Sequence, residues 1–340
     1  MMRRQVGRAG IFVLALMLAI TAAGYADASR TFFAMDTVMT VTVPDKDEAL
    51  LPACEDEVRR LEAFLSVTDE ASEIARLNET GAAALSDETA SLLRFALDMG
   101  GKTGGALDVT LYPVVRAWGF TTAEDDYRVP DDAELAALLS RVGWENMSLD
   151  GNDAHLPEGA MVDLGSVAKG YASDRLAALL REGSADSALI DLGGNIYCVG
   201  AKKDGSSWRI GIRDPKDTTG YVGAIAVKDR AVITSGSYER FFTADDGTVY
   251  GHIFDPATGR PADSGVVSAT VVGESGLLCD ALTTALYVMG TERAAALLET
   301  LPNVEALLVD EDGVIWITPG LKGAFTAMGN YAWAAVKTLY

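Results

Sequence analysis

The sequence predicts an α+β fold, a single catalytic domain of mostly antiparallel sheets flanked by helices. Helical patterns gather in the first half of the chain and strand patterns in the second half. The two patterns do not alternate regularly, as they would in a doubly wound nucleotide-binding fold. The 340 residues are 49% hydrophobic and contain no internal repeat or low-complexity linker, so they can build one large core.

The first 28 residues are typical of a secretory signal peptide. They contain three arginines, an apolar run from Ile11 to Ile20, and a small-residue ending at Ala26 and Ala28. The apolar run is shorter than a membrane span needs. We therefore expect a signal peptide at residues 1–28, a catalytic domain at residues 29–340, and export to the periplasm or the outer face of the cytoplasmic membrane.

The first half of the chain is expected to hold one strand and most of the helices. Residues 31–43 alternate and are rich in β-branched types, which predicts a single strand. Apolar residues at three- and four-residue spacing predict a helix over residues 51–65. Ser86 is a candidate N-cap for a second helix that ends at Gly100 and Gly101. A third helix is expected over residues 131–142, a hairpin between 144 and 164, and a fourth helix over 166–181.

The second half of the chain is expected to be mostly strands. Segments rich in β-branched residues, separated by Gly, Asp and Pro turns, cover 188–200, 208–215, 223–236, 239–255 and 266–273. A helix begins near Cys279. Residues 305–320 surround an Asp-Gly turn and predict a hairpin.

Charge and residue counts exclude several functional classes. Lys and Arg number 28 and Asp and Glu 49, for a net charge of −21, which disfavours nucleic-acid binding. An anionic ligand would need a local positive potential from a metal, helix N-termini or a few lysines. The three cysteines are widely spaced with no CxxC, and there are only two histidines. These counts argue against a disulfide framework and a multi-histidine metal centre.

Asp280 and Thr284 stand four residues apart in the otherwise apolar stretch CDALTTAL. On a helix they would share one face and present two oxygen ligands side by side. Magnesium prefers oxygen ligands and often uses only one or two protein carboxylates. The alternative is structural, with Asp280 capping the helix N-terminus and Thr284 bonding back to the helix.

Two other segments are candidates for binding or catalysis. The run from Asp163 to Tyr171 places a glycine turn, a helix N-terminus and Lys169 together, which suits an anion, although it also fits an ordinary strand-to-helix connection. His252 precedes a tight turn and could act as a base or hydrogen-bond a carbonyl group. His155 lies in an expected loop and is interpreted as solvated.

Motifs of two other enzyme classes match poorly. The glycines of residues 100–105 lack the spacing and the preceding strand of a phosphate loop. Ser166 and Lys169 fit the SxxK of penicillin-interacting serine enzymes, and Lys102 begins a KTG triplet, but their order is reversed and no Ser-x-Asn exists. A serine acyl hydrolase therefore remains a minor alternative.

Nine motifs taken together resemble one family. AMDTVMTV, FLSVTDEASEIARLN, GGALDVTLYPVVRAWGF, VDLGSVAKGYASD, ALIDLGGNIYCVG, WRIGIRDP, ITSGSYERFF, HIFDPATGRP and CDALTTAL follow the motif order of the ApbE family of FAD:protein FMN transferases. The resemblance runs from about Phe32 to Gly290. It implies an ApbE-like, T-fold-like domain.

The resemblance also implies a reaction. FMN would pass from FAD to a threonine hydroxyl of an acceptor protein, in a membrane redox complex, with Mg²⁺ as cofactor and AMP as product. The implied metal ligands are Asp280, Thr284 and the backbone carbonyl of Ala168. The threonine proton would go to His252, the preferred base, or to a magnesium-linked carboxylate, and Asp280 would have to be ionised. An FAD-binding protein, or an FAD pyrophosphatase giving FMN and AMP, would use the same site.

The implied FAD contacts come from several segments. Family members often carry an aromatic residue or Asn in the turn after the first helix, where this chain has Thr68. Trp118 is expected to support the loop at Asp108 or to be plain core. The residues implied to contact FAD are Met35, Thr68, Ala106, Leu107, Asp108, Gly165, Lys169 and Ile253.

Overall fold

A nine-stranded sheet forms the centre of the computed structural model, which describes residues 27–121 and 126–340. Neighbouring strands are antiparallel except for the last pair, β17 and β19. In spatial order the strands are β1 (Asp27–Ala34), β2 (Thr37–Pro44), β6 (Ser187–Leu192), β7 (Asn195–Gly200), β10 (Arg230–Gly236), β15 (Val266–Gly273), β16 (Glu305–Asp310), β17 (Ile315–Ile317) and β19 (Val336–Thr338).

Within the described residues, four smaller sheets lie around the large one. A three-stranded sheet has the order β18 (Phe325–Ala327), β9 (Tyr221–Val227) and β8 (Trp208–Arg213). Another has the order β3 (Ala82–Ala84), β5 (Asp153–His155) and β4 (Ser148–Asp150). The two hairpins are β11 (Phe241–Thr243) with β12 (Val249–Gly251), and β13 (Phe254–Asp255) with β14 (Arg260–Pro261).

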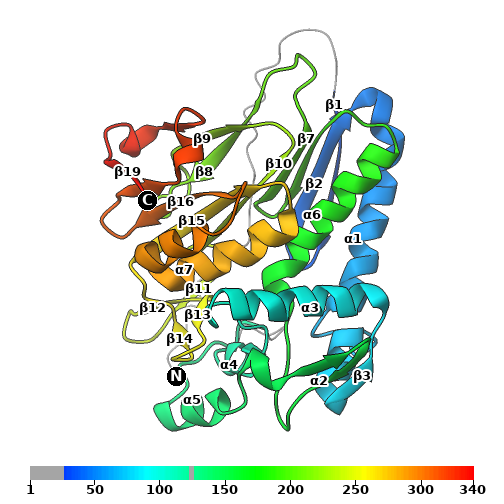
Figure 1. The fold of residues 1–340 in the computed structure, drawn as a ribbon, viewed down its shortest axis with the longest axis vertical. Coiled ribbons are helices and arrows are strands. Elements are labelled where there is room, and N and C mark those ends of the chain that lie inside the picture. The colour runs from blue at the N-terminus through cyan, green and yellow to red at the C-terminus, as the bar shows by residue number, and fades with distance from the viewer. Residues whose placement is uncertain (1–26, 122–125) are drawn as a thin grey trace, which may run out of the picture.

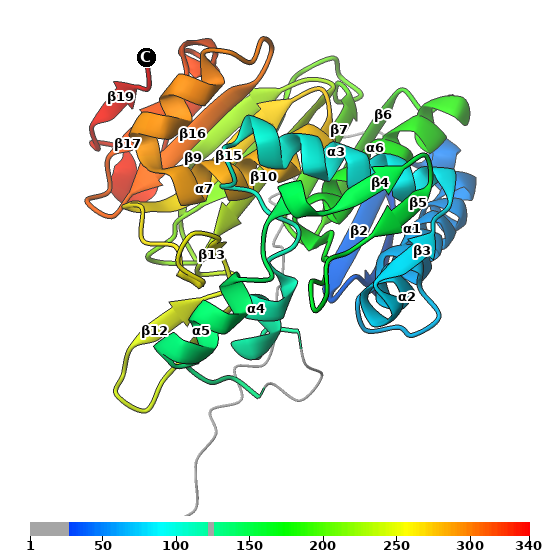
Figure 2. The same ribbon diagram turned by 60° about the horizontal axis from the view of Figure 1, so that its bottom comes forward.

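Helices α1 (Leu51–Leu65), α6 (Gly165–Glu182) and α7 (Gly276–Leu298) cover one face of the large sheet, and the β8–β9–β18 sheet covers part of the other (Figure 1). A third apolar cluster around Trp118 packs α4 and α5 against the two hairpins (Figure 2). This arrangement confirms the α+β class with mostly antiparallel sheets. The helices are α1 (Leu51–Leu65), α2 (Glu73–Thr80), α3 (Asp87–Lys102), α4 (Tyr112–Ala117), α5 (Asp132–Leu139), α6 (Gly165–Glu182) and α7 (Gly276–Leu298).

The prediction of one strand over residues 31–43 is wrong, because the chain reverses at Met35 and Asp36. Both residues have positive φ, 47° and 58°, and they form a tight turn between β1 and β2. Such a turn favours Gly or Asn, neither of which is present. The alternation of apolar residues continues through the turn and hides it in the sequence.

Several segments predicted as strands divide in the structure: residues 188–200 form β6 and β7, residues 223–236 belong to β9 and β10, and residues 239–255 contain β11, β12 and β13. Helices α2 and α4 were not predicted. Ser86 does cap α3, accepting a hydrogen bond from the Thr89 amide, but Gly100 and Gly101 lie inside the helix. The hairpin of 305–320 forms as β16 and β17. All three cysteines are buried and free, and His155 is exposed, both as expected. Within residues 27–121 and 126–340, no helix has the length and apolar character needed to cross a membrane.

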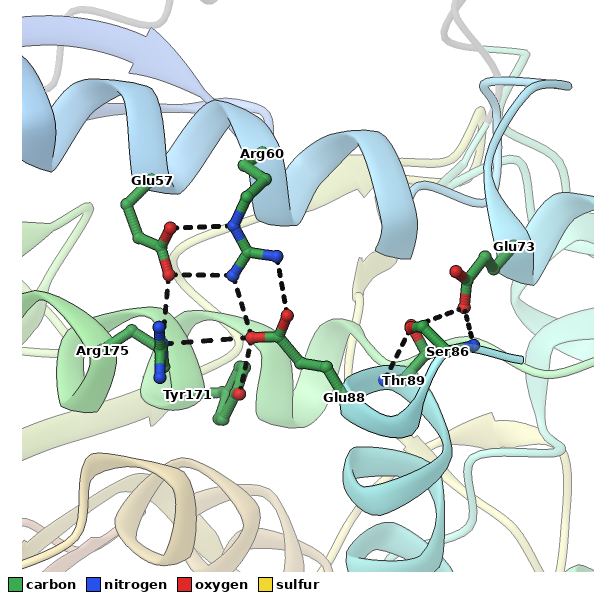
Figure 3. Close-up of polar contacts among 8 residues, drawn as sticks. All are labelled: Glu57, Arg60, Glu73, Ser86, Glu88, Thr89, Tyr171 and Arg175. Carbon is green, nitrogen blue, oxygen red and sulfur yellow. Dashed lines mark hydrogen bonds and ion pairs between the residues drawn. The ribbon is translucent and has the colours of Figure 1, made fainter. Parts of the chain in front are cut away.

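A network of charged residues joins α1, α3 and α6 (Figure 3). The Arg60 guanidinium donates to both oxygens of Glu57 at 2.8 Å, and to both oxygens of Glu88 at 2.6 and 2.9 Å. From α6, Arg175 donates to Glu57 at 3.0 Å and the Tyr171 hydroxyl to Glu88 at 2.7 Å. Bidentate pairs of this kind fix geometry as well as charge, so the network sets how α6 lies against the other two helices.

Candidate functional site

Helices α6 and α7 approach so closely that glycine is required on both. A Cβ added at Gly170 would clash with the Gly276 carbonyl oxygen and lie 2.5 Å from the Cβ of Asp280. A Cβ at Gly276 would lie 2.7 Å from the Gly170 carbonyl oxygen. The missing side chains therefore let the first turns of α6 reach the Asp280 face of α7.

Asp174 of α6 fixes the start of α7. Its carboxylate accepts hydrogen bonds from the Gly276 amide at 2.6 Å, the Leu277 amide at 3.0 Å and the Ser275 hydroxyl at 2.9 Å. Ser275 is the N-cap and accepts from the Leu278 amide. Asp280 thus lies inside the helix, and the capping alternative for it is wrong. Carboxylates near a helix N-terminus are stabilising, so Asp174 anchors α7 at this crossing.

Asp280 points from α7 to α6. It is only 5% exposed, and its Oδ2 accepts a hydrogen bond from the Gly170 amide at 2.7 Å. Burial raises the pKa of this carboxyl group, and the nearby Lys169 ammonium opposes that shift. A buried carboxylate with a raised pKa lacks sufficient positive charge around it. A cation at Asp280 would supply that charge.

The two other predicted metal ligands lie in the same region. Thr284 is half-buried one turn along α7 from Asp280, and Ala168 is buried in the first turns of α6. The back-bonding threonine is Thr283, whose hydroxyl donates to the Asp280 carbonyl at 2.8 Å. Among the described residues the Thr284 hydroxyl makes no hydrogen bond, so the back-bonding alternative is not observed for it.

The donors at this crossing suit a hard cation that keeps several non-protein ligands. The described parts of the chain contain no group of three or more His, Cys, Asp or Glu that could hold a metal ion. A set of one carboxylate, one hydroxyl and one carbonyl would not form such a group, and magnesium accepts it. The buried Asn195 side chain lies beside Asp280, and its interaction with the carboxylate lowers the pKa of that group against the effect of burial.

Lys169 is the charge at the centre of the site. Its ammonium lowers the pKa of Asp163, Glu239 and Asp280, although burial raises the pKa of all three overall. The Glu239 side chain reaches solvent, but the surrounding chain desolvates it and raises its pKa to about 7. Within the described residues Lys169 forms no ion pair within 4 Å. Its charge is therefore available to an anionic ligand.

His252 lies near the same charges. Desolvation, then Arg240 and Lys169, lower its pKa to about 4, so the imidazole is neutral at pH 7. Its Nδ1 lies 3.1 Å from the Arg240 carbonyl oxygen, which can only accept. The hydrogen is therefore on Nδ1, and Nε2 is left with a free lone pair.

The loop before α4 packs beside the start of α6. The Asp163 amide donates to the Val109 carbonyl at 2.9 Å, and Asp163 Oδ1 accepts from the Gly165 amide at 2.8 Å. Ala106 and Leu107 are buried in this loop. The Asp108 carboxylate is held by the Thr110 amide at 2.8 Å and hydroxyl at 2.6 Å. Asp108 therefore shapes the loop with its side chain.

Three further residues predicted to contact FAD are Met35, Thr68 and Ile253. The Met35 amide donates to Glu62 Oε1 at 2.6 Å, and Asp36 is close enough to Asp163 to influence its pKa. Thr68 is exposed in the turn after α1, and no described contact joins it to the crossing. Ile253 is buried directly after His252.

Trp118 lies in the core, whereas three acidic residues near the site were not predicted from the sequence. Trp118 is fully buried and donates from Nε1 to the Gly259 carbonyl at 2.9 Å, so it belongs to the core. Sequence reasoning did not single out Asp163, Asp174 or Glu239. Asp163 and Asp174 flank the anion-binding segment, and Glu239 stands in the quoted motif ITSGSYERFF, so the motifs themselves contained a signal.

Comparisons with known proteins agree with this architecture. A sequence profile described as the ApbE family matches residues 35–308. The FAD:protein FMN transferase of Vibrio cholerae is 38% identical over 247 residues, covering 71% of this chain and 73% of the relative. That of Treponema pallidum is 36% identical over 321 residues, covering 86% and 87%.

Solved structures give the same result. The crystal structure of the ApbE protein from Thermotoga maritima superposes with a TM-score of 0.82 at 31% identity, covering 88% of this chain and 99% of that one. The flavin transferase ApbE from Vibrio cholerae gives 0.77 at 30% identity, covering 88% and 100%. The profile covers most of the chain, and this chain therefore belongs to the ApbE family.

Proposed function

We propose that this chain transfers FMN from FAD to a threonine hydroxyl of an acceptor protein and releases AMP, with Mg²⁺ as cofactor. The observation that carries the proposal is the crossing of α6 and α7, where the buried Asp280 meets the Gly170 amide and the unpaired Lys169 charge is close by. The names of the relatives support the same reaction.

The metal would be held by Asp280, Thr284 and the Ala168 carbonyl. When bound, Mg²⁺ would neutralise the diphosphate of FAD and make AMP a better leaving group. Lys169 would contact the diphosphate from α6. Met35, Thr68, Ala106, Leu107, Asp108, Gly165 and Ile253 would surround the rest of FAD.

The chemical step is a displacement at the FMN phosphorus. The threonine oxygen forms a bond to that phosphorus, and the bond to the bridging oxygen breaks, so AMP leaves with the bridging oxygen. His252 is neutral and has a free Nε2 lone pair, which would accept the hydroxyl proton. Asp280 would be ionised, because a carboxylate binds Mg²⁺ in its charged form.

A denaturing gel separates transfer from hydrolysis. The pure chain is incubated with FAD, Mg²⁺ and a candidate acceptor, and the gel is viewed for flavin fluorescence. We expect a fluorescent acceptor band that chelation with EDTA abolishes. Free FMN and AMP with a dark acceptor would indicate an FAD pyrophosphatase, and retained FAD would indicate a binding protein. The comparisons do not favour the serine acyl hydrolase.

We also propose an exported location and an acceptor in a membrane redox complex. The supporting observation is the signal-like sequence, of which residues 1–26 lie outside the described residues. The domain would then comprise residues 29–340. Strand β1 begins at Asp27, so cleavage after Ala28 would shorten it by two residues. N-terminal sequencing of the mature protein tests the cleavage, because an intact Met1 would contradict it.

A further inference from the structure

The β11–β12 hairpin begins and ends at residues of the candidate site. Arg240 directly precedes β11, and His252 directly follows β12. The backbone N–H of His252 donates to the Arg240 carbonyl at 3.1 Å, which closes the base of the hairpin. Any chain that rests on the base of this hairpin therefore lies next to His252.

The two faces of the hairpin differ in their surroundings. On the inward face the Phe242 ring stacks on Tyr127 at 5.1 Å, and Tyr250 lies 5.1 Å from Trp118. On the outward face Phe241 is 52% exposed and Val249 is 60% exposed. Strand alternation and the Phe242–Tyr250 pairing place the two exposed side chains together on this face. They add nothing to the core, so the exposed apolar face is available to a partner.

The turn of the hairpin is acidic. Asp245 and Asp246 are both exposed, and neither forms an ion pair with a basic side chain in the described chain. The Asp246 carboxylate accepts from the Thr248 amide at 2.9 Å and from the side chain of the same residue. A partner on this face would therefore gain from basic residues close to its apolar contacts.

We propose that the outward face of β11–β12 docks the acceptor polypeptide, as an extended segment whose alternating apolar side chains lie along the strands and whose basic residues meet the acidic turn, away from the target hydroxyl. This inference rests on the proposed function, because transfer requires the hydroxyl to reach the diphosphate beside His252. Figure 2 shows β12 at the lower left beside α5, at the outside of the molecule. Phe241 stands next to Arg240, so the apolar contact starts at the site itself.

The test uses a synthetic peptide of about ten residues with a central threonine, alternating valines and a lysine at each end. Its binding to the full chain with FAD is measured by fluorescence anisotropy. Loss of two buried apolar contacts in Phe241→Ser/Val249→Ser should weaken peptide binding by at least about tenfold. FAD affinity, measured by flavin fluorescence, should stay within about twofold, a small free-energy change. Asp245→Asn/Asp246→Asn should reduce the salt dependence of peptide binding.

The matched control is Trp333→Ser/Val336→Ser, which removes an aromatic and a valine that are 96% and 45% exposed near the C-terminus. It should bind the peptide like the wild type. The docking surface would be overturned if the hairpin variant bound the peptide as tightly as the wild type. It would also be overturned if the hairpin variant lost FAD affinity to the same extent, or if the control variant lost peptide binding. If the wild-type chain does not bind the peptide but transfers flavin to an acceptor protein, the docking inference alone is overturned. If the peptide binds but no acceptor protein becomes fluorescent in the denaturing gel, the transferase function alone is overturned.

Discussion

Glu57 and Asp280 are both carboxylates packed against α6, but their surroundings have opposite effects. Hydrogen bonds from Arg60 hold the pKa of Glu57 at about 2. Burial raises the pKa of Asp280, and Lys169, the Gly170 amide and Asn195 offset that rise only in part. The Glu57 side has its charges paired within the protein, and the Asp280 side has not. The first arrangement stabilises the fold, and the second is completed only when a ligand binds.

The largest effect should come from removing the charge of Asp280. Asp280→Asn keeps an acceptor for the Gly170 amide but would not hold Mg²⁺, so transfer should fall roughly 10³-fold, a loss of about 4 kcal/mol. Its free energy of unfolding should change little. Asp280→Ala also removes the hydrogen bond to the Gly170 amide, at an additional cost of about 0.5–1.5 kcal/mol. Initial rates of acceptor labelling and urea denaturation provide the measurements.

Glu292→Gln, at an exposed position of α7 beyond the helix break at Gly290, is the control and should behave like the wild type. Near wild-type labelling by Asp280→Asn with Mg²⁺ present would show that the two carboxylates do not differ as described.

The second largest loss of transfer activity should come from moving α6 and α7 apart. Gly170→Ala places a Cβ against the Gly276 carbonyl and 2.5 Å from the Asp280 Cβ, so α6 must move. We expect about 1–3 kcal/mol of destabilisation and roughly a 10²-fold slower transfer, because the site loses its geometry. Gly220→Ala is the control, since its nearest neighbour would be the Asp217 carbonyl oxygen at 3.5 Å. If thermal melting and rates show the two variants to be equal, the close crossing is not required.

A smaller effect should follow from breaking the paired network. Arg60→Ala leaves Glu57 and Glu88 short of partners, and we expect a loss of about 1–2 kcal/mol, limited by the partial exposure of Arg60. Labelling rates should change by less than about threefold. Arg60→Lys should recover part of the stability. A large loss of activity at unchanged stability would mean that this network is part of the site.

The smallest effect is a pair of pH dependences with opposite sign. The folded pKa of Glu57, about 2, lies below the ordinary 4.5, so its stabilisation is present above pH 4.5 and disappears as the pH falls towards 2. The folded pKa of Glu239, about 7, lies above 4.5, so its ionisation destabilises the fold increasingly between pH 4.5 and 7.

Denaturation of Glu57→Gln and Glu239→Gln as a function of pH tests this pair. Glu57→Gln should be less stable than wild type near neutral pH, and the difference should narrow on acidification. Glu239→Gln should be the more stable protein above about pH 7, with little difference below about pH 4.5. If both variants differed from the wild type in the same direction at neutral pH, the contrast between the two regions would be contradicted.

The sequence was informative where local patterns decide the structure. Asp280 and Thr284 could be placed on one helix face because helical periodicity requires it. The turn at Met35 was missed because apolar alternation runs through it. The cap of α7 could not be predicted, because Asp174 lies 102 residues before Gly276. Arg60 and Glu88 likewise meet only through packing, and in isolation each is typical of a solvated helix surface.

The paired glycines of α6 and α7 have a consequence for altering this protein. Backbone atoms, together with the Asp280 Cβ and the Ser173 hydroxyl, fill the space beside the two glycines, so a larger residue at Gly170 or Gly276 can only force the helices apart. Engineering a different nucleotide donor would have to begin in the loops around the gap, such as the one holding Ala106 and Leu107. The crossing therefore fixes the distance between α6 and α7.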